Sequence, residues 1–180
     1  MNLIDYSLLE TSVNAAEKQK QTRKTPALRE RVYSQLARAQ KLADEGNVTE
    51  GMAVLEKIKN RQNQLNSYEN AMLWNFIGFI QYSEENISAA VDAFKAVIEQ
   101  EPIPEALEMS TVFSLAQLSM SLERYEDTIA YLDRWETLAN DKTNRASAFT
   151  LRANAMYANK QYQPALTAID AAIAALEDGK

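Results

Sequence analysis

The stretch YENAMLWNFIGFIQYSEENISAAVDAFKAVIEQEP, residues 68–102, decides the fold of this chain. Trp74, Ile77 and Gly78 fall on one face of a helix, because residues three or four apart are neighbours on a helical surface. Ala90 follows Gly78 by twelve residues. A small residue in each of two helices lets their backbones approach closely, while large residues beside it fill the remaining space. The stretch therefore predicts two helices packed as a hairpin.

The same arrangement of small residues recurs along the whole chain. Small residues in the first helix of each expected pair stand 39, 38 and 37 residues apart, at Ala39, Gly78, Ala116 and Ala153. The matching residues of the second helices each come twelve positions later, at Gly51, Ala90, Thr128 and Ala165. This spacing predicts an all-α fold of four hairpins, and hence eight helices.

Start signals for helices accompany three of these elements. Thr25-Pro26 combines a capping hydroxyl with proline at the first helical position, which predicts a helix beginning there. Asn47 with Glu50, and Asn66 with Glu69, have the spacing of a capping box.

The expected last helix, residues 162–177, is unusual. Its segment ALTAIDAAIAAL (165–176) is apolar nearly all round, whereas the last helix of a stacked array normally has a polar outer face. We expect four residues to pack on the preceding helix, namely Ala165, Ile169, Ala172 and Leu176. Leu166 and Ile173 should then face something further on. A following repeat, self-association through helix 162–177, or a simple preference for helix-forming alanine would each explain this pattern.

Composition narrows the function before any site is considered. The 180 residues include neither Cys nor His, which removes thiol nucleophiles, imidazole bases, disulfides and the usual zinc sites. A net charge of -6 argues against general nucleic-acid binding, which needs a basic face. No run of 18 apolar residues exists, so we expect no membrane span.

The charge is distributed unevenly. Residues 1–40 hold seven Lys/Arg against four Asp/Glu, and the remainder holds twelve against twenty-one. We interpret residues 1–24 as a leader or tag, or a flexible basic arm, ahead of a helical repeat domain at 25–178. The cations of this arm are expected to be solvated or to contact an anionic lipid or acidic partner: Lys18, Lys20, Arg23 and Lys24.

Carboxylate clusters are the remaining candidates for chemistry, because paired carboxylates can transfer protons. They occur at Glu84-Glu85 and at Glu99, Glu101, Glu105 and Glu108. Their places at turns and on outer faces predict solvated surface instead. We find no phosphate-binding loop and no metal-ligating pattern. The sequence therefore predicts no catalytic, metal-binding or cofactor-binding residue, and a protein that is not an enzyme.

The repeated hairpins resemble the tetratricopeptide repeat (TPR), although 37–39 residues exceed the standard length of roughly 34. The resemblance implies a right-handed α-solenoid. A narrower resemblance covers about residues 25–178 and concerns a bacterial TPR family associated with TonB systems. It rests on Leu115-Ala116-Gln117-Leu118 in one helix and on Asp133-Arg134-Trp135 in the next.

This narrower resemblance implies a function and a location. Members of the family are encoded beside TonB, ExbB and ExbD and are exported to the periplasm, so the chain would be a periplasmic scaffold of such a system. The family also has a cleavable leader, which residues 1–15 do not match because Asp5 and Glu10 interrupt the apolar core that a leader needs. It has further repeats beyond the position of Lys180, so we expect an excised domain. The alternative is a general peptide-binding TPR adaptor with an unrelated partner, which could be cytoplasmic.

In TPR proteins the first helix of each hairpin lines a concave surface that binds a peptide. The residues expected there are Tyr33, Leu36, Gln40, Met72, Asn75, Phe79, Tyr82, Phe113, Gln117, Met120, Thr150, Asn154 and Tyr157. Amides can pair with a peptide main chain and aromatic rings supply contact area. Alternatively, Leu36, Met72 and Phe79 pack between hairpins. The set contains no Lys or Arg, unlike TPR domains that bind a chaperone's terminal carboxylate.

Overall fold

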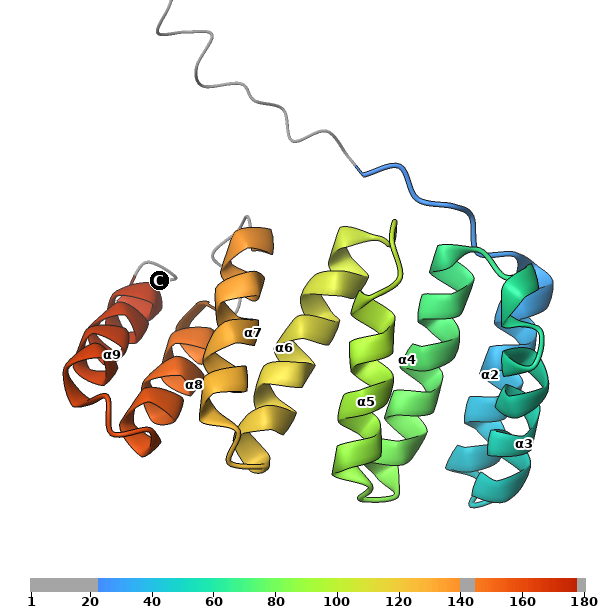
Figure 1. Cartoon of the computed structure of the whole chain (residues 1–180), viewed down its shortest axis with the longest axis horizontal. Coiled ribbons are helices and arrows are strands. Elements are labelled where there is room, and N and C mark those ends of the chain that lie inside the picture. The colour runs from blue at the N-terminus through green and yellow to red at the C-terminus, as the bar shows by residue number, and fades with distance from the viewer. Residues whose placement is uncertain (1–22, 140–144, 178–180) are drawn as a thin grey trace, which may run out of the picture.

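The computed structural model describes residues 23–139 and 145–177, and it confirms the predicted all-α fold. Eight α-helices form a row of four antiparallel pairs, with no strand among the described residues (Figure 1). The helices are α2 (Glu30–Asp44), α3 (Val48–Lys59), α4 (Ser67–Ser83), α5 (Ile87–Ile98), α6 (Glu105–Ser121), α7 (Tyr125–Leu138), α8 (Arg145–Ala158) and α9 (Tyr162–Glu177). One short 3-10 helix, Gln62–Gln64, lies between the first two pairs.

Each pair is joined by a three-residue turn of one design. Its middle residue has a positive φ in all four pairs: Gly46 (86°), Glu85 (60°), Glu123 (58°) and Lys160 (61°). The third residue donates its backbone N–H to a carbonyl five residues earlier, as Asn47 does to Leu42 at 2.8 Å. This is the Schellman closure of a helix C-terminus. Identical turns explain why the small-residue markers keep their twelve-residue spacing.

The small residues lie where the paired helices come closest. A Cβ atom added to Gly51 would stand 2.6 Å from the backbone oxygen of Ala39, which confirms that predicted pair. A Cβ atom added to Gly78 would stand 2.7 Å from Cε1 of Phe94, one turn beyond Ala90. Gly78 therefore makes room for a buried aromatic ring.

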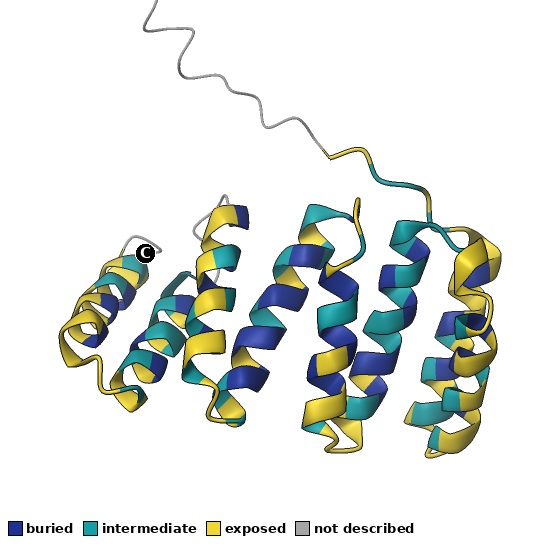
Figure 2. Ribbon diagram, viewed as in Figure 1, coloured by how far each residue is buried: buried dark blue, intermediate teal, exposed yellow. Residues whose placement is uncertain are grey.

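Two hydrophobic clusters form the core. One joins the first pair to α4 and includes Leu36, Leu55 and Ile80. The other runs from α4 to α8 and includes Phe94 and Trp135. Trp74 of α4 packs against both clusters and connects them. Figure 2 shows that buried residues are concentrated on the middle helices.

The segment before α2 is part of the folded structure. It is not helical, so the start predicted at Thr25-Pro26 is wrong and α2 begins at Glu30. The Asn66 side-chain amide donates to the backbone oxygen of Ala27 at 2.9 Å, which holds this segment against the N-terminus of α4. A tertiary contact has therefore overridden a local start signal. In Figure 1 the segment passes over the ends of the middle helices to reach α2.

Two buried carboxylates anchor this segment. Glu69 receives hydrogen bonds from Arg29, from Nε to Oε1 and from Nη2 to Oε2, both at 2.6 Å. Glu108 binds Arg134 of α7 at 2.6 Å through Oε1 and Arg23 through Oε2. Glu108 is buried, so the prediction that it is solvated is wrong. Arg23 is likewise engaged with the protein, and Lys24 is exposed as expected of a solvated cation. Positions 18 and 20 lie outside the described residues.

The predicted capping boxes have different outcomes. Asn66 and Glu69 form the box at α4, with both side-chain bonds present. Asn47 makes no side-chain cap bond, so the prediction for α3 is wrong. In the tight turn at Gly46, the Asn47 backbone N–H instead donates to the backbone oxygen of Leu42.

The last helix differs from its prediction in which residues it buries. α9 buries Ala165, Ala168 and Ala172, whereas Ile169 and Leu176 are exposed. The alanines of α8 and α9 let these two helices pack closely, which leaves no room for larger side chains between them. The large residues of α9 consequently lie outside.

We expect Gly78→Leu to lower the free energy of unfolding by more than about 1 kcal/mol, because the new side chain would overlap the buried Phe94 ring. Chemical denaturation of both proteins measures this difference. Ala89→Leu is a matched control at an exposed position of the neighbouring helix and should change stability by less than about 0.5 kcal/mol. Equal effects of the two substitutions would contradict the close contact.

We expect Glu69→Gln to destabilise the fold by about 1–3 kcal/mol at pH 7, because it removes charged hydrogen bonds from a buried site. Hydrogen bonds from Arg29 lower the pKa of Glu69 below its ordinary value of 4.5. The stabilisation is therefore present above pH 4.5 and is lost as the pH falls through the folded-state pKa. The difference between the two proteins should shrink below pH 4.5 in denaturation curves.

The exposed pair Glu56–Lys59 provides the control for this measurement. Glu56→Gln should change the free energy of unfolding little at pH 7 and at pH 3, because exposed ion pairs contribute little to stability. A Glu69→Gln deficit that stays constant from pH 7 to pH 3 would contradict the assigned ion pair.

Candidate functional site

The first helices of successive pairs form one side of the array. α2 contacts α4 directly and α6 contacts α8, whereas successive second helices make at most sparse contacts. In a curved stack the row with the closer contacts lies on the inner side. Between α4 and α6 the contacts are also at most sparse. We call the side formed by α2, α4, α6 and α8 the inner surface.

The predicted site residues fall into three groups by exposure. The exposed ones are Tyr33, Phe79, Tyr82, Gln117, Thr150, Asn154 and Tyr157. The half-buried ones are Gln40, Met72, Asn75, Phe113 and Met120. Leu36 is completely buried in the core with Leu55, so its inclusion in a partner-binding surface is wrong. Leu36 belongs to the buried stripe of α2, with Val32 and Ala39, which packs in a core cluster shared with α3 and α4.

Four of these residues line a single cavity of about 400 Å³ between α6 and α8. Phe113 and Gln117 are four residues apart on α6, and Thr150 and Asn154 are four apart on α8. Residues with this spacing share one face of a helix, so each helix presents both of its predicted residues to the cavity. The other lining residues are Ala146, Ser147, Leu151 and Leu176. We call this cavity the inner pocket.

The inner pocket combines an apolar wall with free amides. The Phe113 ring packs on Trp135, with ring centroids 5.7 Å apart, so its position is fixed from behind. The side chains of Gln117 and Asn154 are exposed and make no hydrogen bond with the described part of the chain. An amide can donate to a carbonyl and accept from an N–H, which matches the main chain of an extended peptide.

Other exposed aromatic residues of the predicted set lie outside the inner pocket. The Phe79 ring contacts Phe94 edge to face at 5.4 Å, and Tyr157 contacts Tyr162 at 5.5 Å. Each ring therefore lies against the second helix of its own pair. These contacts hold Phe79 and Tyr157 in place while leaving them exposed.

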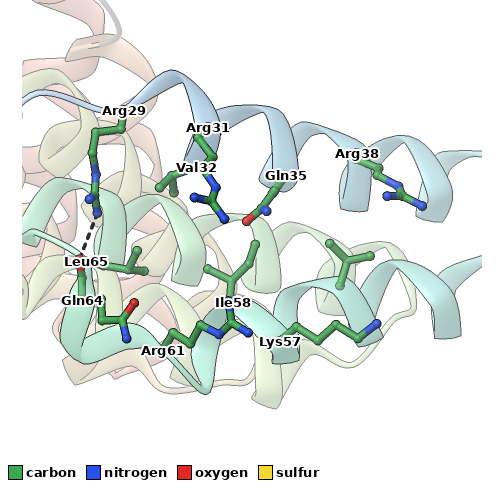
Figure 3. A pocket seen from close by; sticks show the side chains of 11 residues that line it. Arg29, Arg31, Val32, Gln35, Arg38, Lys57, Ile58, Arg61, Gln64 and Leu65 are labelled. Carbon is green, nitrogen blue, oxygen red and sulfur yellow. Dashed lines mark hydrogen bonds between the residues drawn. The ribbon is translucent and has the colours of Figure 1, made fainter.

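A second cavity, of about 430 Å³, was not predicted from the sequence. It lies between α2 and α3 and is lined by Arg29, Arg31, Val32, Gln35, Arg38, Val54, Lys57, Ile58, Arg61, Gln64 and Leu65 (Figure 3). No Asp or Glu is among these residues. The spacing of Arg31 with Arg38, and of Lys57 with Arg61, is visible in the sequence. Only the pairing of α2 with α3 brings the four cations together. We call this cavity the basic groove.

No cluster of acidic residues within the described ranges is arranged to hold a metal ion. Among the same residues, none of the helices has the length and apolar character needed to cross a membrane. The buried carboxylates Glu69 and Glu108 are each bound to arginine. Burial acts to raise the pKa of Glu108, but hydrogen bonds from Arg134 and Arg23 lower it overall. Both groups stabilise the fold and face neither cavity.

Solved structures with the same architecture have low sequence identity to this chain. A crystal structure of MamA matches with a TM-score of 0.63 over 94% of this chain and 85% of that chain, at 14% identity. A structure of a MamA RS-1 double mutant matches with a TM-score of 0.64 over 83% and 77%, at 15% identity. A kinesin-light-chain-like protein from Podospora anserina with nearly identical TPR-like repeats gives 0.66 over 96% and 86%, at 18% identity.

The sequence matches no protein-family model. None of the curated proteins is similar to it at a significant level. At identities below 25% the structural matches show the fold alone, and this fold is a TPR-like repeat solenoid. Arrays of this kind present surfaces for protein partners.

The sorting of predicted residues into core and surface is directly testable. We expect Leu36→Ala to destabilise the chain by about 2–5 kcal/mol, because it leaves a cavity in the core. Gln117→Ala and Asn154→Ala should each change stability by less than about 0.5 kcal/mol, because both side chains are exposed. Chemical denaturation measures all three. A large loss of stability from either amide substitution would mean that it supports the fold and is not free for a partner.

Proposed function

We propose that this chain is a non-enzymatic scaffold whose inner surface binds an extended segment of a protein partner. The observation that carries the proposal is the inner pocket, where Gln117 and Asn154 extend free amides beside the Phe113 ring. Hydrogen bonds from amides to a peptide main chain are independent of sequence, and the aromatic wall adds apolar contact area. The TPR-like architecture of the matched structures supports a partner that is a protein.

We further propose that the partner belongs to a TonB-type energy-transduction system and that the chain works in the periplasm. This assignment rests on the sequence resemblance, including Gln117 within Leu115-Ala116-Gln117-Leu118 and the Arg134-Trp135 pair. Both elements have a defined place in the fold. Gln117 lines the inner pocket, Arg134 binds the buried Glu108, and Trp135 supports the Phe113 ring. The resemblance therefore includes residues that form and support the proposed site.

The alternative is a peptide-binding adaptor with an unrelated partner, which would not require export. The same pocket chemistry serves this role, because main-chain recognition does not specify one sequence. The two functions differ in the identity of the bound protein and in the compartment where binding occurs.

Site-specific photocrosslinking in cells of the natural host tests the proposal. A photoreactive phenylalanine analogue at Thr150, which is exposed at the rim of the inner pocket, should crosslink to one specific protein. The same analogue at Ser88, exposed on the second helix α5, is the matched control and should not give that product. Mass spectrometry of the product identifies the partner.

Each outcome has a defined meaning. A TonB, ExbB or ExbD relative bound at Thr150 supports the full proposal, and another protein bound there supports the adaptor. Gln117→Ala with Asn154→Ala should reduce the product at least about fivefold, since each lost hydrogen bond contributes about 0.5–1.5 kcal/mol. Equal crosslinking from Thr150 and Ser88, unchanged by these substitutions, would overturn the inner pocket as the site.

A further inference from the structure

The two ends of the array have surfaces that differ in charge. The basic groove lies at the N-terminal end, on the first helix pair, and Figure 3 shows it with the other helices behind. Arg29 is engaged with Glu69, but Arg31, Arg38, Lys57 and Arg61 form no ion pair with any described residue. Four unpaired cations around one groove create a positive potential that favours an acidic ligand.

The groove also has an apolar floor, made by Val32, Val54, Ile58 and Leu65. A small inorganic anion would make no use of this floor. The cations extend along the groove, because Arg31 and Arg38 are seven residues apart and therefore about 10 Å apart along the axis of α2. This arrangement fits an elongated ligand with separate negative charges and apolar groups, such as one face of an amphipathic helix.

The C-terminal end of the same chain presents such a helix. α9 buries its alanines against α8 and exposes Leu166 and Ile173, which are 55% and 51% accessible. Asp170 and Glu177 share this face, because positions 166, 170, 173 and 177 follow the spacing of neighbours on a helix. Residues 162–177 contain no Lys or Arg. We call this face the acidic stripe.

The acidic stripe and the basic groove match in spacing as well as in charge. Asp170 and Glu177 are seven residues apart, as are Arg31 and Arg38, so both pairs of charges are about 10 Å apart along their helices. Ile173 lies between Asp170 and Glu177 along α9, and Leu166 lies one turn before Asp170. These two apolar side chains match the apolar floor of the groove. We propose that α9 of one copy of this chain binds in the basic groove of a second copy, head to tail.

This contact has consequences for the assembly. It joins two different surfaces, so it is heterologous and generates an open filament or a closed ring in place of a two-fold dimer. Opposite charges attract each other at the rim of this contact. Salt screens that attraction, with a screening length of about 10 Å at 0.1 M, so the contact weakens as the salt concentration rises. The inner pocket includes one residue of α9, Leu176, which is not part of the acidic stripe. The inference uses the basic groove and the acidic stripe alone and does not rest on the proposed function.

Sedimentation velocity of the whole chain, from about 1 to 200 µM in low salt, tests the proposal. The chain should form species larger than a monomer as its concentration rises. Arg31→Glu with Arg38→Glu should raise the concentration needed for association at least about tenfold, and so should Asp170→Lys with Glu177→Lys. One chain carrying all four reversals should regain association, because the exchanged charges attract again.

A charge-matched control distinguishes the proposed contact from a general effect of net charge. Glu126→Lys with Asp127→Lys changes the net charge by the same amount as the α9 reversal, at exposed positions of α7, and should leave association unchanged. Circular dichroism melting checks that each variant remains folded. A wild-type monomer at 200 µM would overturn the proposal. So would association that survives the groove reversal, because that result indicates contact between two α9 helices.

Discussion

The constraint on which the whole structure depends is the three-residue turn between the helices of each pair. One residue with a positive φ and one bond from the next N–H to a carbonyl five residues back fix where the second helix begins. The register between the two helices is then the same in every pair. Gly51 meets the backbone of Ala39 because of this register, and a larger side chain at position 51 would force the first pair apart. Stacking follows, because only closely paired helices present a continuous apolar face to the next pair.

This constraint explains why the helical architecture could be predicted from the sequence. Identical turns produce a periodic pattern of small residues, and a fixed spacing can be recognised from the sequence alone. Contacts between distant parts of the chain leave no such pattern. Nothing local in the sequence indicates that Arg23 reaches Glu108, or that the backbone of Ala27 receives a bond from Asn66. For the same reason Thr25-Pro26 predicts a helix start that the fold does not use, since the ion pairs and hydrogen bonds of this segment hold it in a non-helical form.

The candidate site could be predicted only in part, for a related reason. Helical spacing indicates which residues share a face, and it correctly groups Phe113 with Gln117 and Thr150 with Asn154. It does not indicate how far a helix is rotated against its neighbour, and this rotation decides that Leu36 enters the core. The basic groove needs two helices to be placed before its four cations become neighbours. Sites formed by one helix face are therefore visible in the sequence, whereas sites between helices depend on the packing.

The distribution of large buried side chains determines which junction of the array is weakest. Every buried residue of α8 and α9 is alanine, whereas the middle pairs bury Phe94, Trp135 and several leucines. Stability in a repeat array is approximately the sum of its units and their junctions, so the last pair contributes least apolar burial. It is held to α7 partly by Arg152, which bridges Asp133 at 2.5 Å and Glu136 at 3.0 Å. One wall of the inner pocket belongs to this last pair. A ligand that binds both α6 and α8 would therefore stabilise the junction that opens most easily, so that occupation of the pocket and order at the C-terminal end are thermodynamically linked.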